Sequence, residues 1–380
     1  MRIQSLYYRD EDCNWTLQPT QFDLLTLFVG ISGVGKSRIL EAIMSLRDVV
    51  LGHTDRLGGV SFTVEFSTGT SSYRWKCRFE ALHRPNLKSR HARQLYPTWE
   101  MLGVPLRPAI VEEQLVQGSE EIFRRDVDGC YFQGKLLPRP NPYRSMLELF
   151  SSEPVLKEVR DSFLSIFLME FTSDMNVLVD ASLAKLYEER NSAEDERQII
   201  TSNAPLIAKL AYYSKARPEK FQRIRQKFID VFPQVEDLCF REVTDSRFYI
   251  LHLKERGTDY IPQGNFSSGM FKTLLFLTQL SMLEGSCVVL IDEIENSLGL
   301  NCIDILTDEL AEVECDDQFF ITSHHPYIIN NIDMEYWRVV NRKGSAVSVK
   351  TAKDLHMGDS SHEAFFQLIN SAGYRKGIEL

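Results

Sequence analysis

The sequence lacks several features that would assign it to other classes of protein. It has no apolar run long enough to cross a bilayer, and residues 1–10 contain no apolar signal-peptide core. The seven cysteines form no C-x-x-C pair, and no histidine stands at metal-ligand spacing from them. Scattered thiols are typical of a reducing compartment, so we expect a cytoplasmic protein without disulfides, a zinc site or membrane contact. We also find no internal repeat and no low-complexity segment.

What is present is an ordinary globular composition with an acidic balance. Hydrophobic residues make up 43% of the 380 residues and charged residues 25%, and the formal net charge is −10. This charge argues against general coating of nucleic acid, although a net value does not exclude local basic stretches. Such stretches lie at 83–93, 135–144 and 223–227, and each is typical of a solvated face. Contact with DNA or RNA therefore stays an open expectation.

One segment carries a specific chemical signature. Residues 30–37 read G-I-S-G-V-G-K-S, which fills every fixed position of the phosphate-binding motif G-x-x-x-x-G-K-[ST]. A buried strand over 22–29 and an amphipathic helix over 38–49 give the context that this motif requires. The glycines let N–H groups turn toward a polyphosphate, and the helix N-terminus adds its positive end. The predicted nucleotide-binding residues are Gly30, Ser32, Gly33, Val34, Gly35, Lys36, Ser37 and Arg38.

A second segment supplies acids for such a site. Residues 287–291 predict a buried strand, and Asp292 and Glu293 follow it directly. We expect this strand to lie beside the strand of the phosphate loop. Asp292 would then reach a Mg²⁺ ion held by Ser37, while Glu293 polarises the attacking water. A further strand over 319–322 leads to His324, whose imidazole can contact the γ-phosphate or that water.

The remaining pattern divides the chain into three segments. Residues 1–150 are strand-rich, 151–232 are helical, and 233–380 return to strands around the acids. Hairpins are expected over 60–80 and 122–137 in the first segment. The elements expected in the third are strands over 235–243, 247–255, 288–291 and 319–322, a helix over 265–283, a strand pair over 337–349 and a helix over 363–372. Phe266-Ser267-Ser268-Gly269-Met270 begins the first of these helices and suits capping or anion binding.

The order of these motifs resembles that of the ABC-type ATPase heads. Residues 266–270 look like the signature Leu-Ser-Gly-Gly-Gln of that class, and His324 looks like its switch histidine. The chain departs from the pattern in two places. Gly299 stands where an Asp is usual in the loop after the catalytic Glu, and the Gln that links Mg²⁺ to the helical lobe is not identifiable. The candidates for that Gln position are Gln114, Ser151 and Glu153.

The resemblance implies an α/β fold, with a mixed sheet around a central helix, an antiparallel lobe and an inserted helical lobe. It implies ATP and Mg²⁺ as cofactors. It also implies that Ser267, Ser268 and Gly269 complete the ATP site of a second copy, so that two heads trap two ATP molecules in a homodimer or a larger homo-oligomer. Glu293 and His324 would then hydrolyse ATP slowly and reopen the pair.

Within this class the chain is most similar to the overcoming-lysogenization-type branch, the ATPases of bacterial anti-phage systems. The similarity lies in the amino-acid sequences of residues 28–37, 267–270, 292–299 and 321–326. These segments resemble the ATPase subunit of Septu and its retron-linked relatives, which work with a separate HNH nuclease. The ATPase of PARIS, whose partner nuclease is of the Toprim type, is nearly as similar. No acidic Toprim constellation follows His324, so we expect any nuclease to be on another chain. The resemblance implies that this chain is an ATP-driven switch that regulates such a nuclease.

Two other functions stay open at this stage. A DNA-engaging clamp of the chromosome-maintenance kind would need a long coiled-coil insert, and the helical middle is too short and irregular for sustained heptads. A scaffold that binds ATP without turnover fits the departures at Met270 and Gly299. ATP-dependent oligomers without hydrolysis would identify such a scaffold, and salt-sensitive DNA binding would identify a clamp.

Overall fold

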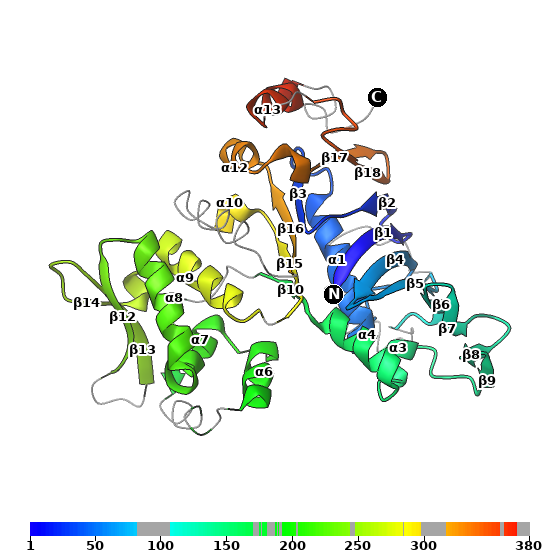
Figure 1. Cartoon of the computed structure of the whole chain (residues 1–380), viewed down its shortest axis with the longest axis horizontal. Coiled ribbons are helices and arrows are strands. Elements are labelled where there is room, and N and C mark those ends of the chain that lie inside the picture. Colours follow the sequence, from blue (N-terminus) through cyan, green and yellow to red (C-terminus); the bar gives the residue numbers. More distant parts are fainter. Residues whose placement is uncertain are drawn as a thin grey trace, which may run out of the picture. The chain divides into compact units, whose positions relative to one another are not determined.

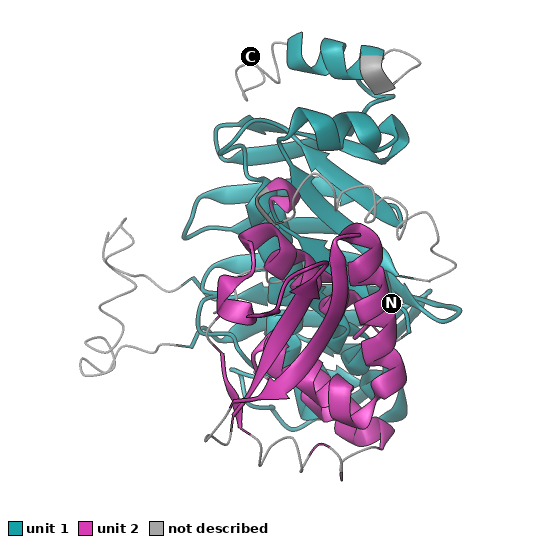
Figure 2. Cartoon of the chain, turned by 90° about the vertical axis from the view of Figure 1, so that its left-hand side faces the viewer, with its two compact units in different colours: residues 1–168, 285–292, 314–380 teal, residues 169–284, 293–313 magenta. Residues whose placement is uncertain are grey.

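The computed structural model describes residues 1–81, 107–169, 175, 177–180, 187, 189, 192–202, 204–243, 248–283, 285–297, 317–357 and 361–370. The chain forms two compact units, which Figure 2 shows in separate colours. Unit 1 comprises residues 1–168, 285–292 and 314–380, and unit 2 comprises 169–284 and 293–313. The sequence pattern placed its segment boundaries elsewhere, after residues 150 and 232, and the two units are described separately below.

Unit 1 is built on a 14-stranded mixed sheet. Its strands, in spatial order, are β10 (Ile166–Leu168), β15 (Val288–Ile291), β16 (Gln318–Ser323), β3 (Leu25–Val29), β17 (Trp337–Lys343), β18 (Ala346–Thr351), β2 (Trp15–Gln21), β1 (Arg2–Asp10), β4 (Val60–Thr68), β5 (Ser71–Phe79), β6 (Ile110–Gln117), β7 (Glu120–Arg125), β8 (Cys130–Phe132) and β9 (Lys135–Leu137). Figure 1 labels these strands along the sheet. The strands from β10 to β17 run parallel to one another. Their carboxyl ends therefore meet at one edge, where the loops after β3, β15 and β16 lie together.

The order of these parallel strands corrects one expectation. The strand that ends before Asp292, β15, does not lie beside the strand of the phosphate loop, because β16 is hydrogen-bonded between β15 and β3. All residues of β15 and β16 are buried, so hydrophobicity alone could not decide which of them is the neighbour of β3. Strand spacing of about 4.8 Å places β15 and β3 roughly 10 Å apart. Side chains beyond the strand ends must bridge that distance.

Helix α1 (Lys36–Leu51) is the main helix of unit 1 and confirms the helix predicted over 38–49. Its buried positions recur with helical spacing, among them Ile39, Ile43 and Leu46, and they belong to the same core as the sheet. Gly52 ends the helix in the left-handed conformation and donates to the carbonyl oxygens of the last turn. The other helical segments of unit 1 are α3 (Met146–Leu149), α4 (Pro154–Leu164), α12 (Pro326–Asn331), η4 (Met334–Tyr336) and α13 (Ser361–Asn370).

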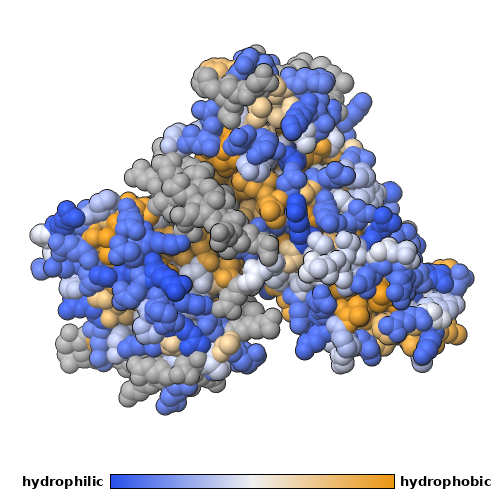
Figure 3. Space-filling view, in the orientation of Figure 1, coloured by the Kyte–Doolittle hydropathy of each residue, from blue (hydrophilic) through white to orange (hydrophobic). Residues whose placement is uncertain are grey.

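The antiparallel half of the sheet confirms both predicted hairpins. Strands β4 and β5 pair in register from Ser61 to Thr68, and alternate side chains of both strands are buried. Strands β7 and β8 are joined by a turn over residues 126–129, and β9 continues from them. The face of the molecule in Figure 3 is mainly hydrophilic. Val127 and Leu136 are among the large apolar side chains of unit 1 that are exposed to solvent.

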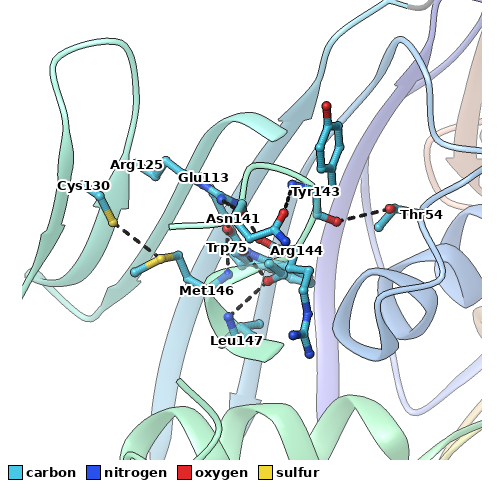
Figure 4. Close-up of polar contacts among 11 residues, drawn as sticks. Thr54, Trp75, Glu113, Arg125, Cys130, Asn141, Tyr143, Arg144, Met146 and Leu147 are labelled. Atoms are coloured by element: carbon cyan, nitrogen blue, oxygen red, sulfur yellow. Dashed lines mark hydrogen bonds and ion pairs between the residues drawn. The ribbon is translucent and has the colours of Figure 1, made fainter. Parts of the chain in front are cut away.

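A buried polar cluster joins the antiparallel half to the chain that follows it (Figure 4). Glu113, on β6, is fully buried and accepts hydrogen bonds from Arg125 Nη2 at 2.7 Å, Ser145 Oγ at 2.5 Å, the Met146 N–H at 3.0 Å and Trp75 Nε1 at 3.3 Å. Arg125 also donates to the carbonyl oxygens of residues 141 and 144. These bonds fix the extended segment between β9 and α3 against β6.

Unit 2 combines a helical layer with a small antiparallel sheet. Its helices are α6 (Ala193–Thr201), α7 (Leu206–Ala216), α8 (Pro218–Val231), α9 (Ser268–Leu280) and α10 (Ile294–Ser297), and a short 3₁₀ segment, η2, spans Gln263–Asn265. The strands are β11 (Val179–Asp180), β12 (Val235–Glu242), β13 (Phe248–Glu255) and β14 (Tyr260–Pro262). Helices α7, α8 and α9 contact one another, and α8 also contacts β12.

Outside the middle of the chain, the helices and strands predicted by range are present with bounds that differ by a few residues, whereas β14, α10 and α12 were not predicted. The helical stretch predicted from 154 to 232 is interrupted by β10 and β11, which have only three and two residues. Among the described residues of this stretch the longest helix is α8, with 14 residues. None of the helices in the described ranges has the length and apolarity that a membrane span requires.

Candidate nucleotide-binding site

The loop between β3 and α1 has a backbone shape that favours glycine at Gly35. This residue has φ +113°, and a Cβ atom there would lie 3.3 Å from Trp15 Nε1 and 3.4 Å from Val347 Cγ2. At Gly33, with φ +83°, a Cβ atom would meet no described atom within 4 Å. The loop is therefore closely backed by protein at Gly35 and open at Gly33.

The N-terminus of α1 is arranged to receive an anion. Gly35 is the N-cap, so it has no side chain that could accept from the first N–H groups, and the first turn contains no acidic residue. Uncapped N–H groups and the positive end of a 16-residue helix dipole attract negative charge. The loop and this helix end together form an anion-binding geometry of the phosphate-loop type.

Lys36 lies folded against the loop. Its Nζ donates to the carbonyl oxygen of Gly30 at 2.7 Å and to that of Ile31 at 3.1 Å, and the residue is only 7% exposed. The ammonium charge is thus held at the loop rather than directed into bulk solvent. In the G-x-x-x-x-G-K-[ST] motif this lysine reaches the β/γ-phosphates, which stays the role predicted for Lys36.

The structure brings Ser37 and Asp292 together, although they are separated by 255 positions in the chain. Ser37 Oγ donates to Asp292 Oδ1 at 3.0 Å. Thr322 Oγ1 donates to the same oxygen at 2.6 Å. Ser37 and Asp292 were both predicted for this site, whereas Thr322 was not singled out. The only sequence signal for it was its place near the end of the strand that leads to His324.

Arg38 lies on the first turn of α1, beside Ser37. Its guanidinium carbon is 5.1 Å from the centre of the Trp15 ring, and Nη2 is 3.6 Å from Asp10 Oδ2. Burial and the nearby Asp10 carboxylate raise the pKa of the Cys13 thiol above its ordinary value, and Arg38 partly opposes this shift. Arg38 thus contacts Asp10 of β1 and Trp15 of β2 from the first turn of α1.

Glu293 follows Asp292 and adopts φ +45°, which is in the left-handed region that few non-glycine residues occupy. Such a conformation costs about 1–3 kcal/mol and occurs at functional sites more often than elsewhere. The predicted catalytic carboxylate therefore follows the predicted metal-shell carboxylate at a strained position of the backbone.

The two adjacent histidines after β16 have different environments. His325 is the N-cap of α12, and its Nδ1 accepts from the Tyr327 N–H at 3.2 Å. His324, which was predicted for the site, is exposed directly after the end of β16. Of the two imidazoles, His324 is the one that does not cap the helix.

The Ser-Ser-Gly segment belongs to unit 2. Ser267 is the N-cap of α9, and its Oγ accepts from the Met270 N–H at 3.2 Å. Ser267 and Ser268 are exposed, and Gly269 is half-buried in the first turn. A Cβ atom at Gly269 would meet no described atom within 4 Å beyond its own helix. Two features noted in the sequence, Gly299 and the basic stretch at 83–93, lie outside the described residues.

Comparisons with known proteins give a family and a fold for the chain. A family model described as "AAA domain, putative AbiEii toxin, Type IV TA system" matches residues 135–330, just over half of the chain. The chain is also similar to the crystal structure of the SmcHead bound to the C-winged helix domain of ScpA. That similarity has a TM-score of 0.52 at 13% identity and covers 94% of this chain and 100% of the other.

A second solved structure is the Smc head domain with an extended coiled coil bound to the C-terminal domain of ScpA, derived from Pyrococcus furiosus. It has a TM-score of 0.47 at 13% identity and covers 93% of this chain and 98% of the other. No curated protein matches the chain. The first of the two structures and the family match confirm the predicted fold class, an α/β P-loop ATPase fold of the ABC type.

Proposed function

The chain belongs to the family of AAA-domain proteins described as "putative AbiEii toxin, Type IV TA system", and on that premise we propose that it is an ABC-type ATPase that works as a switch. The single observation that carries this proposal is the hydrogen bond between Ser37 and Asp292 beside the glycine loop. In a P-loop ATPase, Mg²⁺ is held by a hydroxyl of the phosphate loop and by an Asp carboxylate, so the two groups must lie close together.

The residues present fit ATP and Mg²⁺. Hydroxyl and carboxylate oxygens are the ligands that Mg²⁺ prefers, and Ser37 and Asp292 supply both kinds. The open side of the loop at Gly33 leaves room beside the uncapped N–H groups of α1. Mg²⁺, when bound, would neutralise charge on the phosphate oxygens. In this proposal Lys36 holds the β/γ-phosphates, and Gly30, Ser32, Val34, Gly35 and Arg38 complete the nucleotide site.

Hydrolysis is assigned to Glu293 and His324. Glu293 would accept a proton from the attacking water, because it is the carboxylate next to the metal-shell acid. Its strained left-handed backbone supports a functional role, because such strain is found at active sites more often than elsewhere. His324 would contact the γ-phosphate or the water from the end of β16. The exposed position of His324 supports this role. His325 is a weaker candidate, because its Nδ1 caps helix α12.

We further propose that ATP closes two copies of the chain over shared nucleotide. Ser267, Ser268 and Gly269 of one copy would complete the site that contains Lys36 of the other. The exposed serines at the start of α9 support this, because N–H groups at a helix start can bind the phosphates of a nucleotide held by another chain. ATP would stabilise the closed pair by mass action, and hydrolysis would reopen it.

The biological role that fits best is regulation of an effector nuclease in a bacterial anti-phage complex. The resemblance to the Septu ATPase favours an HNH nuclease on a separate chain, and the resemblance to PARIS favours a Toprim nuclease. The toxin wording of the family description supports a defence role but names no nuclease. The reading frame beside this gene distinguishes the two, because it would encode one nuclease type or the other.

The test of the switch uses Glu293→Gln and the matched control Glu219→Gln, which changes an exposed carboxylate on α8. With ATP and Mg²⁺, Glu293→Gln should stop phosphate release and shift the sedimentation coefficient to that of a dimer or larger assembly. The control should behave as the wild type. Wild-type turnover by Glu293→Gln would contradict the assignment of the catalytic carboxylate. A monomer under saturating ATP would contradict the closed pair.

A second candidate function is a DNA-engaging clamp, which the fold similarity to the SmcHead favours. That similarity extends to the fold alone, and the described helices of the middle segment are too short for a coiled-coil arm. The two functions differ in their response to salt. Binding to duplex DNA that requires ATP and falls steeply with salt concentration would favour the clamp, because phosphate contacts release counterions.

A further inference from the structure

Thr322 occupies a particular place in the parallel sheet. It lies on β16, the strand between the one that carries the phosphate loop and the one that ends before Asp292. In register, Thr322 stands opposite Phe28 of β3, and the preceding Ile321 stands opposite Ile291 of β15. Thr322 is therefore one residue further toward the carboxyl edge than the last paired residue of β15. Its hydroxyl can meet the side chain of Asp292, which is the next residue after that strand.

The contact is short, and the threonine that makes it is buried. Thr322 is fully buried, and its Oγ1 lies 2.6 Å from Asp292 Oδ1, which is closer than the 3.0 Å from Ser37 Oγ to the same atom. Hydrogen bonds from a hydroxyl to an ionised carboxylate are typically about 2.5–2.7 Å long and are stronger than neutral ones. Replacing a buried threonine by valine would keep its shape, so packing alone does not require a hydroxyl here.

Two hydroxyls from different elements thus hold one oxygen of Asp292. Ser37 reaches it from α1 and Thr322 from β16, so the carboxylate can rotate only by breaking one of the bonds. In the part of the chain that the structure describes, both of these bonds end on Oδ1. The arrangement fixes the direction of Oδ2, which is the kind of preorganisation that a metal shell needs.

We infer that Thr322 is a positioning residue for the metal-shell carboxylate: it holds Asp292 in the orientation in which Ser37 and Asp292 receive Mg²⁺ with the nucleotide. This inference rests on the proposed function, because it concerns the same site. It adds a role for β16, the strand that lies between β3, which leads into the phosphate loop, and β15, which ends before Asp292. Thr322 itself would touch neither the nucleotide nor the metal.

The test measures the dissociation constant of ATP with Mg²⁺ and again with EDTA. Thr322→Val removes the hydroxyl and keeps the shape, and Thr322→Ser keeps the hydroxyl. The matched control is Thr26→Val on the neighbouring strand β3, because Thr26 is also fully buried but its hydroxyl has no partner among the described residues. The unfolding temperature of each variant is measured in parallel.

Thr322→Val should weaken ATP binding about tenfold with Mg²⁺, and less than about twofold with EDTA. Thr322→Ser and Thr26→Val should stay within about twofold of the wild type under both conditions. If Thr322→Val does not fold, Thr322→Ala must give the same Mg²⁺-dependent loss. Equal losses with and without Mg²⁺, or no loss in a folded variant, would overturn the positioning role.

Failure of the proposed function gives a different result. If the wild type itself binds ATP equally well with Mg²⁺ and with EDTA, the metal site is wrong, and the inference about Thr322 is overturned with it. If the wild type depends on Mg²⁺ and the Thr322→Val variant keeps that dependence, only the inference is overturned.

Discussion

The buried Glu113 should be one of the strongest single contributors to the stability of unit 1. Removing its side chain in Glu113→Ala leaves Arg125, which is only 6% exposed, without its 2.7 Å ionic partner. It also removes the acceptor for the Ser145 hydroxyl and the Met146 N–H. Breaking a buried pair by removing one partner costs about 3–5 kcal/mol.

The matched control is the preceding residue. Glu112, on the same strand, forms ion pairs with Lys76 and Arg78 on the solvent side, and exposed pairs are worth about 0–1 kcal/mol. Glu112→Ala should therefore lower the free energy of unfolding by about 1 kcal/mol or less. Two neighbouring glutamates should differ several-fold in their contribution because their side chains point to opposite faces of β6.

The assay is alkylation of Cys130, followed by mass spectrometry in increasing urea. Cys130 is buried beside Met146, with the two sulfur atoms 3.5 Å apart, so its reaction reports opening of the region that Glu113 anchors. In Glu113→Ala it should react at urea concentrations at which the wild type and Glu112→Ala are still protected. Equal protection in the two variants would refute the attribution of stability to the buried cluster.

Two further predictions concern the phosphate loop and acid stability. Gly35→Ala should lower the free energy of unfolding more than Gly33→Ala, because only a Cβ atom at position 35 would contact Trp15 and Val347. Urea titrations measure the two free energies, and equal losses would refute the steric argument. A hydrogen bond from Lys76, opposed by partial burial, holds the pKa of Glu112 below its ordinary value. The stabilisation from this depressed pKa is present above the unfolded pKa, near 4.3, and is lost as the pH falls through the folded pKa. Lys76→Met should reduce the loss of stability between about pH 5 and pH 3, and an unchanged pH slope would contradict this.

Much of the fold could be predicted because its signals are local. The strand, glycine loop and helix around Lys36 follow from apolar spacing and from the fixed residues of one motif. The hairpin over β4 and β5 follows from strict alternation on both sides of a short polar turn. The chemistry expected of Ser37 and Asp292 requires them to be in contact, and the structure places them there.

The features that were missed depend on contacts between distant parts of the chain. Strands β10 and β11 are too short to have a period of their own, and each exists because a longer neighbour pairs with it. The position of β16 between β3 and β15 could not be read from the sequence, because all three strands are largely buried and carry similar hydrophobic patterns. Thr322 becomes informative only through that order, because the order brings its hydroxyl to Asp292.

The most direct test of the nucleotide site is calorimetric titration of ATP with Mg²⁺ into the wild type, Lys36→Ala and the control Lys157→Ala, which changes an exposed lysine on α4. The wild type and the control should bind with the same affinity. Lys36→Ala should bind at least about 100-fold more weakly, because it loses charge-assisted hydrogen bonds to the phosphates. Wild-type affinity in a folded Lys36→Ala variant would contradict the assignment of the loop as the ATP site.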